Sequence, residues 1–361
     1  MSGVMSTLEA INIDVIATVA ERTFLSPFFT FWIPVLAICQ NSRPFFNVSL
    51  LLFAFVLLRS TVMFLSRAWL NRRWTRGEID WSEQLVVVTG GSNGLGRVLV
   101  ETLVLKHVAV IVLDVVPFSD QPSGEDGDVV FYQCDITDPK AVREVASKIR
   151  QEHGHPTILV NNAGVVRAKL IIDLEPEEVQ RTFGVNTLSQ FYLLKEFLPE
   201  MIKNNSGHIV TISSTLGESG VAQVSDYCAS KAGTISLHQS LRQELNSKYN
   251  CHKVRTTLVC QGLMTTGMFK KIVPQNQFFF PSLSPHDIAK KILRSIDNEE
   301  SEEIFVPLYT NYSWLMKVLP YFMIDLVHLA SNSNQSMIHI SSNTSHTDSY
   351  KDDKESKKKK L

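Results

Sequence analysis

Three side chains in the second half of the chain have the types and spacing needed to move a proton. Tyr227 and Lys231 stand four positions apart in Tyr-Cys-Ala-Ser-Lys, so on a helix both would project from one face. A phenol with a pKa near 10 is a poor base at neutral pH, and a nearby ammonium lowers that pKa by favouring the phenolate. Such a tyrosine can exchange a proton with an alcohol or a ketone. Ser214 precedes Tyr227 by 13 residues, and its hydroxyl could orient the substrate oxygen.

Spacing alone does not settle this chemistry, because a Tyr and a Lys four apart also form an ordinary amphipathic pair on many helices. The position of Ser214 favours the catalytic interpretation, since it follows the apolar run 208–212, which is typical of a buried strand. A side chain at a strand end could meet a side chain on the first turn of the next helix.

A glycine-rich turn earlier in the chain has the features of a phosphate site. Glycines let a backbone turn tightly and approach a pyrophosphate, which the positive end of a following helix attracts. An ordinary tight turn is the alternative, but an apolar run precedes this turn and a helical pattern follows it. The residues that we predict to contact a dinucleotide here are Gly90, Ser92, Asn93, Gly94, Leu95 and Gly96.

Asp114 lies 18 residues beyond Gly96, at the end of the next apolar run. A carboxylate there can accept hydrogen bonds from ribose hydroxyls and repels a 2′-phosphate. Lys and Arg are both absent from Gly90 through Gly96. The sequence therefore favours NAD(H) over NADP(H).

Short apolar runs alternate with amphipathic stretches between residues 84 and 308. This alternation, without hairpin signals, predicts an α/β fold in which a doubly wound parallel sheet of the Rossmann type forms one catalytic domain. Ligands of such sheets bind at the carboxyl ends of the strands. Strands are predicted at 85–88, 108–113, 129–132, 158–160, 208–212, 256–259 and 304–306, and helices at 95–106, 139–151, 176–203, 227–248 and 285–295.

The segment 23–66 contains only two charged residues, Arg43 and Arg59. Within it, 45–65 is 21 residues long, enough for a helix to cross a hydrocarbon core of about 30 Å. The run 24–39 contains two prolines and could be an interfacial arm, a re-entrant segment or half of a membrane hairpin. A buried helix of a soluble fold is the alternative, and a cleaved signal peptide fits poorly because acidic residues precede the apolar run. Four arginines follow between 67 and 76, which predicts a cytosolic location for the rest of the chain.

Composition excludes several classes of protein. The 361 residues are 44% hydrophobic, and 35 basic against 36 acidic residues give a net charge of -1. A nucleic-acid partner is therefore not expected, nor is a wholly disordered chain. The five cysteines are scattered, which argues against a disulfide framework or a structural zinc site and fits a reducing compartment; we predict no metal.

The predicted organisation has six parts. The tail, 331–361, reads as disordered, and its terminal lysines either are simply solvated or form a dilysine retrieval signal of endoplasmic reticulum proteins. A helical stripe before it is expected to pack against its own domain rather than against lipid. The parts are a leader at 1–23, membrane-anchoring segments at 24–66, a basic linker at 67–83, the NAD-binding catalytic domain at 84–310, an amphipathic helix at 311–330 and the tail at 331–361.

Several motifs in order resemble the short-chain dehydrogenase/reductase family, in its standard-length subclass. They are Thr89-Gly-x-x-x-Gly94-x-Gly96, Asp135 in Cys-Asp-Ile-Thr-Asp, Asn161-Asn162-Ala163-Gly164, Asn186 in Val-Asn-Thr, Ser214, and Tyr227-x-x-x-Lys231. The resemblance implies that Tyr227 is the acid/base, that Lys231 binds the nicotinamide ribose and lowers the tyrosine pKa, and that Ser214 polarises the substrate oxygen.

The same resemblance assigns further residues. Asn186 would hold a proton-relay water, Asp135 would meet the adenine amino group, and Asn162 would mostly brace the sheet. One departure is Gln261 before Gly262, where the family usually has Pro-Gly; Thr266 then falls at the family's nicotinamide-contacting threonine, or is a plain surface residue. The remaining cofactor-binding candidates are Ile136, Ala163, Gly164, Gly262 and Thr266.

Within the family, the chain resembles the membrane-associated retinol and 17-beta-hydroxysteroid dehydrogenase branch of the endoplasmic reticulum and lipid droplets. We therefore expect an NAD(H)-dependent oxidoreductase that interconverts hydroxyl and carbonyl on a retinoid, sterol, steroid or long-chain lipid. The alternatives are an NADPH-dependent reductase of acyl-dihydroxyacetone phosphate or 3-ketosphinganine, and a non-catalytic lipid-droplet scaffold. The family also implies a homodimer through the long helices 176–203 and 227–248, and a substrate lid at 267–283 whose three phenylalanines could line a lipid pocket, touch the membrane or simply pack.

Overall fold

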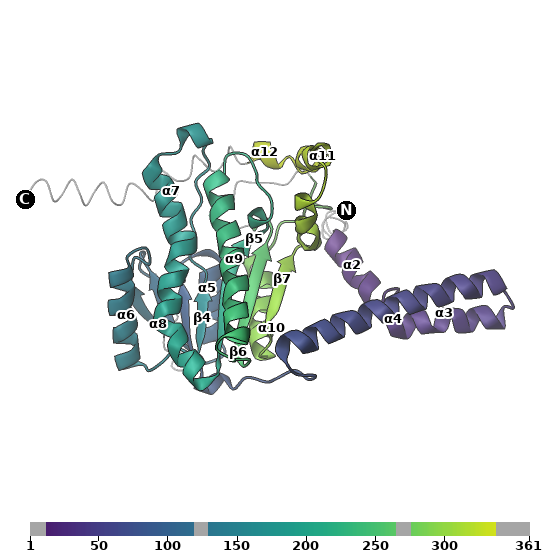
Figure 1. The fold of residues 1–361 in the computed structure, drawn as a ribbon, viewed down its shortest axis with the longest axis horizontal. Coiled ribbons are helices and arrows are strands. Elements are labelled where there is room, and N and C mark those ends of the chain that lie inside the picture. Colours follow the sequence, from purple (N-terminus) through teal and green to yellow (C-terminus); the bar gives the residue numbers. More distant parts are fainter. Residues whose placement is uncertain (1–11, 119–128, 265–275, 337–361) are drawn as a thin grey trace, which may run out of the picture. The chain divides into compact units, whose positions relative to one another are not determined.

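The computed structural model describes residues 12–118, 129–264 and 276–336. Apolar, β-branched runs form a seven-stranded sheet in which every pairing is parallel, in the order β3-β2-β1-β4-β5-β6-β7 (Figure 1). The order reverses between β1 and β4, which opens a crevice at the carboxyl ends of these strands. The doubly wound fold is confirmed. Its strands are β1 Leu85–Thr89, β2 Ala109–Asp114, β3 Val129–Gln133, β4 Ile158–Asn161, β5 Gly207–Ser214, β6 Val254–Gln261 and β7 Glu302–Val306.

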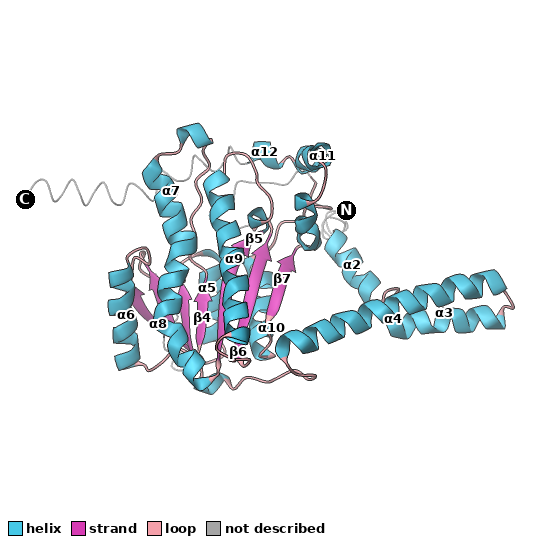
Figure 2. Ribbon diagram, viewed as in Figure 1, coloured by secondary structure: helices cyan, strands magenta, loops and turns pink. Residues whose placement is uncertain are grey.

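Helices cover both faces of this sheet, because successive strand residues point to opposite sides (Figure 2). Val86 and Val88 of β1 pack with α5 and α10, whereas Val87 between them packs with α6, α8 and α9. Both layers are buried, which explains why the strands read as continuous apolar runs. The bounds are α5 Gly94–Val104, α6 Pro139–Glu152, α7 Pro176–Phe183, α8 Ser189–Asn204, α9 Ser225–Ser247 and α10 Pro285–Asp297.

Strands β5 and β6 are longer than predicted, and the difference positions a functional residue. They pair in register from Gly207 with Val254 to Ser214 with Gln261. This pairing extends β5 by two residues beyond the predicted end at 212, so Ser214 is the last residue of the strand. The side chain of Ser214 therefore comes from a rigid element.

The single helix predicted at 176–203 is divided. A π-helical turn, Gly184–Leu188, separates α7 from α8. The carbonyl oxygen of Asn186 accepts hydrogen bonds from the side chains of Gln190 at 2.9 Å and Thr234 at 3.0 Å. These side-chain donors stabilise the wider turn. The periodicity of apolar residues carries no information about such polar contacts, so it predicts one continuous helix.

The described residues up to Arg76, together with Gln277–Pro281, form a separate compact unit. It contains α2 Ile13–Arg22, α3 Pro27–Cys39 and α4 Arg43–Asn71. Helix α4 has the length and apolar composition to cross a membrane, and α2 with α3 forms a pair that passes the same criteria but bends by 62°. Phe31 of α3 contacts Phe53 of α4, with ring centroids 5.7 Å apart, and Arg59 pairs with Glu21 at 3.0 Å. The backbone of Ile13 donates to the Phe278 carbonyl at 3.0 Å, so Phe278 belongs to this unit.

The segment predicted as one amphipathic helix at 311–330 consists of two elements. A 3-10 helix, Leu308–Lys317, is followed after Pro320 by α11, Tyr321–Ser331, and by the short α12, Ser333–Ser336. Proline cannot continue the hydrogen-bonding pattern of a preceding helix, which explains the break. No residue of α11 is fully buried, and Ile324, His328 and Ser331 are half-buried, so the expectation that it packs against its own domain stays a prediction. The remaining tail, 337–361, lies outside the described residues, as do positions 1–11 of the leader and 267–275 of the expected lid.

Candidate active site

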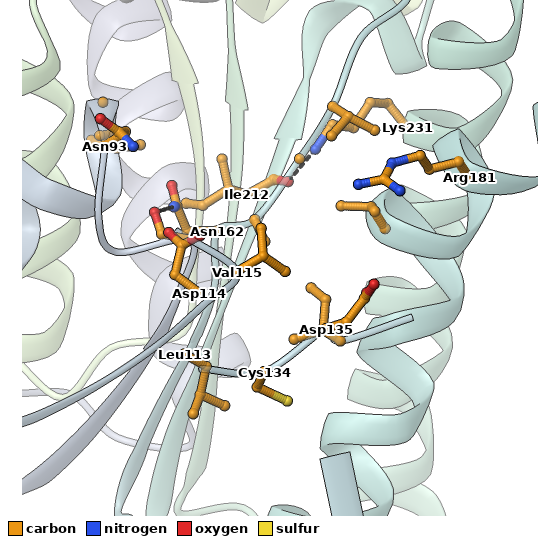
Figure 3. A pocket seen from close by; sticks show the side chains of 18 of the residues that line it. Asn93, Leu113, Asp114, Val115, Cys134, Asp135, Asn162, Arg181, Ile212 and Lys231 are labelled. Atoms are coloured by element: carbon orange, nitrogen blue, oxygen red, sulfur yellow. Dashed lines mark hydrogen bonds between the residues drawn. The ribbon is translucent and has the colours of Figure 1, made fainter. Parts of the chain in front are cut away.

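A cavity of about 330 Å³ lies at the crevice where the strand order reverses (Figure 3). It is lined by residues from the glycine turn, from the carboxyl ends of β2, β3, β4, β5 and β6, and from the helices α7 and α9. The predicted site residues found in its wall are Gly90, Asn93, Gly94, Leu95, Asp114, Asp135, Ile136, Asn162, Ala163, Gly164, Tyr227 and Lys231. Ser92, Gly96, Asn186, Ser214 and Gly262 are not among the residues that line it, and Thr266 lies outside the described residues.

The glycine turn is shaped for close approach of a ligand. Gly90 and Gly94 have φ values of +65° and +60°, a conformation that side-chain-bearing residues seldom adopt. A Cβ on Gly96 would lie 2.5 Å from the amide nitrogen of Asn162, which itself donates to the carbonyls of Thr89 at 2.9 Å and Gly90 at 3.0 Å. The missing side chains thus leave a cradle beside the first turn of α5, whose free backbone N–H groups suit a pyrophosphate. These residues fit a dinucleotide.

Asp114 ends β2 and faces the cavity. One of its carboxylate oxygens accepts from the Ser92 backbone at 3.0 Å and the other from the Val116 backbone at 3.1 Å. Each carboxylate oxygen has further lone pairs, so these bonds leave it able to accept from a ribose. Asp135 is held similarly, because its Oδ1 accepts from the backbone and the hydroxyl of Thr137 at 3.1 and 2.7 Å. Both carboxylates therefore have fixed orientations.

Tyr227 and Lys231 project together from the first turns of α9, as predicted. The Lys231 Nζ donates to the Ile212 carbonyl at 2.9 Å and lies 5.8 Å from the centroid of the Tyr227 ring. Both side chains are at least 96% buried. Ser214 approaches the same tyrosine from β5 and hydrogen-bonds to it. The three predicted catalytic side chains thus converge from two elements.

Burial controls the ionisation of this pair. It raises the pKa of Tyr227 above the ordinary range for a phenol, and the hydrogen bond with Ser214 opposes that shift. Burial also lowers the pKa of Lys231 to about 8. The predicted role of Lys231 in lowering the tyrosine pKa stays a prediction, and in this structure its Nζ donates to the Ile212 carbonyl. The neutral phenol is consequently the dominant form at pH 7, which suits a proton donor.

Asn186 connects three elements behind the cavity. Its side-chain oxygen accepts from the Val165 backbone N–H at 2.8 Å, and its amide nitrogen donates to the Val165 carbonyl and the Ser230 hydroxyl at 3.0 and 2.9 Å. A Cβ on Gly164 would lie 3.5 Å from the Asn186 oxygen and 3.6 Å from the Lys231 Nζ. Asn186 therefore fixes the wall next to the lysine, and its predicted role with a water stays a prediction.

Sequence reasoning missed several residues of the wall. Arg181, Val185, Cys134 and Met264 line the cavity, and the guanidinium of Arg181 points into it (Figure 3). Arg181 lies about one helical turn before Asn186, and Cys134 directly precedes Asp135, so proximity to the motifs was the available signal. The hydroxyl of Tyr309 accepts from the Leu263 backbone at 3.4 Å, beside Gly262. No sequence pattern joined Tyr309 to this loop.

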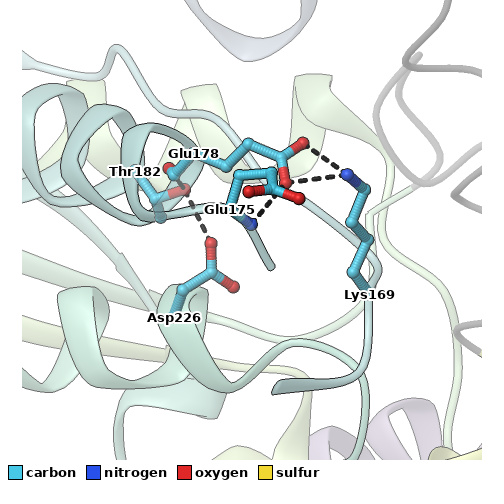
Figure 4. Close-up of polar contacts among 5 residues, drawn as sticks. All are labelled: Lys169, Glu175, Glu178, Thr182 and Asp226. Atoms are coloured by element: carbon cyan, nitrogen blue, oxygen red, sulfur yellow. Dashed lines mark hydrogen bonds and ion pairs between the residues drawn. The ribbon is translucent and has the colours of Figure 1, made fainter. Parts of the chain in front are cut away.

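A buried hydrogen bond fixes the start of α9. Asp226 directly precedes Tyr227, and its Oδ2 accepts from the Thr182 hydroxyl of α7 at 2.7 Å (Figure 4). Helix α7 is itself capped by Glu178, which accepts from the Glu175 backbone at 3.1 Å and from the Lys169 ammonium at 2.7 Å. This chain of contacts holds the catalytic tyrosine against the helix that carries Arg181.

The arrangement can perform an acid/base reaction at a carbon–oxygen bond. A bound nicotinamide would supply or accept the hydride. The Tyr227 hydroxyl can give a proton to a substrate oxygen or take one from it, and the Ser214 hydroxyl can hydrogen-bond the same oxygen. The described residues contain no group of three or more acidic, histidine or cysteine side chains that could hold a metal ion.

Comparisons with known proteins agree with this geometry. Residues 84–277 match the family model described as short chain dehydrogenase. The chain is 42% identical over 200 residues to dehydrogenase RED2 of Cochliobolus heterostrophus, which covers 55% of this chain and 75% of that protein. It is 32% identical over 265 residues to retinol dehydrogenase 10-B of Danio rerio, covering 66% and 79%.

A solved structure of a short-chain oxidoreductase is also similar to this chain. A metagenomic short-chain oxidoreductase in complex with NADP has 28% identity and a TM-score of 0.52, over 62% of this chain and 97% of that one. The family match covers more than half of the chain and contains the whole cavity wall. The chain therefore belongs to the short-chain dehydrogenase/reductase family and is an NAD(P)-dependent oxidoreductase that acts on alcohols or ketones.

Proposed function

We propose that the chain is a membrane-anchored, cytosol-facing, NAD(H)-dependent oxidoreductase that interconverts a hydroxyl and a carbonyl on a hydrophobic lipid-type substrate, such as a retinoid, a sterol or steroid, or a long-chain lipid. The observation that carries this proposal is that Asp114, Tyr227 and Lys231 line one and the same cavity. A cofactor that reaches from one end of this wall to the other would present its ribose to Asp114 and its reactive ring to Tyr227.

The preference for NAD(H) is supported by the charge at the end of β2. A 2′-phosphate next to the Asp114 carboxylate would face like-charge repulsion. The carboxylate of Asp114 accepts hydrogen bonds from the Ser92 and Val116 backbones, so rotation away from a 2′-phosphate would break these hydrogen bonds. The NADP complex of the solved relative is a property of that protein, and direct comparison of the two cofactors is needed here.

The hydrophobic substrate is supported by the surroundings of the tyrosine. Tyr227 packs in a cluster with Val166, Ala168, Val221 and Val224, and Leu216 and Leu263 pack against that cluster. An apolar wall beside the proton donor favours a substrate with an apolar body. The Danio rerio relative is named a retinol dehydrogenase, which agrees with this class.

Attachment to a membrane is supported by α4. It is 29 residues long, and only 11% of its most apolar 18-residue window is buried. The arginines that follow at 67–76 favour a cytosolic catalytic domain. The resemblance to the retinol dehydrogenase branch favours the endoplasmic reticulum membrane, with lipid droplets as a second location.

A homodimer through the long helices stays part of the proposal. Phe191 of α8 and the preceding Leu188 are 50% and 45% exposed, which gives this surface apolar side chains for a second copy. Light scattering of the purified protein should give the mass of two chains, and Phe191→Glu should reduce it to one.

The proposed function is tested by turnover in vesicles. The full-length protein is reconstituted, and initial rates are measured for retinoid, steroid and long-chain alcohols with NAD and with NADP at equal concentrations. We expect turnover of at least one lipid alcohol, with NAD preferred by ten-fold or more in kcat/KM. Preference for NADP, or turnover of small polar alcohols alone, would contradict the proposal.

A further inference from the structure

The C-terminal arm, residues 308–336, exposes a large apolar surface. Tyr321 is 86% exposed, Leu329 75% and Phe322 66%. The neighbouring apolar side chains that are also exposed are Tyr312, Trp314, Val318, Met323, Leu326 and Val327. Full burial of one such side chain is worth about 1.5–3 kcal/mol, so an arm left in water forgoes a large stabilisation.

Most of the exposed apolar residues of α11 lie along one side of the helix. At about 100° per residue, Phe322, Met323, Leu326, Val327 and Leu329 fall within an arc of about 160°, and the half-buried residues of the helix lie on the opposite side. A helix with one exposed apolar face and a polar remainder suits a position in the plane of a lipid surface, with the apolar face toward the acyl chains.

The arm is joined to the substrate side of the active site. Lys317 forms an ion pair with Glu218, and Asn334 accepts from the Ala222 backbone at 3.1 Å through its side chain. Glu218 and Ala222 lie in the segment between Ser214 and Tyr227, which carries the apolar cluster around the tyrosine. At its start the arm also holds the loop at Leu263 through Tyr309. A surface that receives the arm therefore lies next to the substrate-binding segment.

The composition of the arm indicates which surface this is. Tyr312, Trp314 and Tyr321 precede the Phe, Leu and Val residues of α11, and aromatic side chains beside aliphatic ones are typical of the boundary between lipid headgroups and acyl chains. Asp325 is the only acidic residue of α11, and Lys317 already has a partner in Glu218. The chain also contains α4, which has the length and composition of a membrane helix. The proposed function already assigns the chain to a membrane, so a lipid surface is an apolar medium that the same protein would meet.

We propose that the C-terminal arm inserts α11 into the lipid surface and thereby places the substrate-binding segment 215–224 against it. A hydrophobic substrate would pass from the lipid to Tyr227 along the arm without crossing water. This inference rests on the proposed function, because it assigns the route by which a lipid substrate reaches the site.

The location of α11 is tested by fluorescence on the full-length protein. In a Cys39→Ser background, Leu326→Cys carries an environment-sensitive dye. Leu105→Cys is the matched control, because Leu105 is also an exposed leucine (80%) and lies at the amino ends of the strands, away from the active site. In phosphatidylcholine vesicles with nitroxide-labelled acyl chains, we expect at least two-fold quenching at position 326 and none at 105. Absence of quenching at 326 would overturn the proposal. If the dye at 326 shows a blue shift without quenching, and the shift disappears in the monomeric Phe191→Glu variant, a second copy of the chain and not lipid covers α11, which would also overturn the proposal.

The route of the substrate is tested by kinetics on the same vesicles. Phe322→Asp with Leu326→Asp should raise KM for a membrane-dissolved long-chain alcohol at least ten-fold, and leave kcat/KM for a short water-soluble alcohol within two-fold. Leu105→Asp should change neither value. Equal KM values in wild type and double variant would overturn the proposal while leaving the proposed function intact. Quenching at 326 in a protein that oxidises no lipid alcohol would instead contradict the proposed function alone.

Discussion

Lys231 keeps a potentially charged group in one of the driest parts of the described structure. Only 3% of the residue is exposed, and the Ile212 carbonyl is its one hydrogen-bond acceptor that the structure shows. Desolvation lowers its pKa from 10.5 to about 8. At pH 7, burial of the protonated Lys231 therefore lowers the free energy of unfolding. Catalysis requires this lysine, whereas the stability of the fold does not.

Replacement of this lysine should stabilise the protein at neutral pH. The difference between 10.5 and about 8 corresponds to about 3 kcal/mol, from which the lost bond to Ile212 subtracts about 1 kcal/mol. Lys231→Met should thus raise the free energy of unfolding by about 2 kcal/mol at pH 7, measured by chemical denaturation in detergent, while turnover is lost.

The same change has a defined pH dependence. Between pH 8 and 10.5 the unfolded lysine binds more protons than the folded one, so the wild type gains stability as the pH rises through this window. The advantage of Lys231→Met should be complete below pH 8 and should shrink toward pH 10. An advantage that is constant with pH would show that the lysine charge is not its origin.

Asp114 should determine the choice of cofactor. Asp114→Asn retains an oxygen for the Ser92 or Val116 backbone but removes the charge. We expect the ratio of the NADP to NAD dissociation constants to fall by about ten-fold, which corresponds to about 1.4 kcal/mol. Titration calorimetry measures both constants, with Asp173→Asn as an exposed control that should change neither.

At the scale of elements, the hydrogen bond between Thr182 and Asp226 fixes α9 against α7. The other carboxylate oxygen of Asp226 has no hydrogen-bond partner among the described residues, so Thr182→Val would leave a buried carboxylate without any side-chain donor. We expect a loss of about 2 kcal/mol in the free energy of unfolding and a several-fold lower kcat. Thr182→Ser keeps the hydroxyl and should restore both values; if it does not, the methyl group and not the hydrogen bond is responsible.

Most elements around the site were predictable because they are buried runs with a clear period. The strands of the sheet are apolar on both faces, and the helix with Tyr227 and Lys231 begins within two residues of its predicted start. The π-helical turn at Gly184–Leu188 was not predictable from the apolar pattern. Thr234, which stabilises it, lies far away in sequence, and Gln190 is a polar residue that the apolar pattern does not include. Tyr309 was missed because it lies far in sequence from Leu263, the residue that it contacts. Arg181 was missed because a charged residue on a helix normally faces solvent.

At the scale of the whole molecule, the chain contains its own reporter of membrane topology. Cys39 at the end of α3 is exposed, whereas the other four cysteines are buried. If α4 crosses the membrane and the arginines at 67–76 face the cytosol, Cys39 and the turn before α4 lie on the far side.

Thiol labelling of sealed, cytosol-side-out microsomes tests this arrangement. A membrane-impermeant maleimide should leave the protein unlabelled until the vesicles are permeabilised, and Cys39→Ser should remove the signal. Labelling of intact vesicles would contradict a span through α4. Protection that persists after permeabilisation would indicate that the turn stays within one leaflet.

Tyr227 lines the cavity that would hold the cofactor, and we propose that it transfers the proton during turnover. The measurement that tests it most directly compares Tyr227→Phe with the wild type for both oxidation of a lipid alcohol and binding of NAD. We expect kcat to fall by at least a thousand-fold, while the dissociation constant for NAD changes by less than about three-fold. Turnover within ten-fold of the wild type in a variant that binds NAD normally would contradict it.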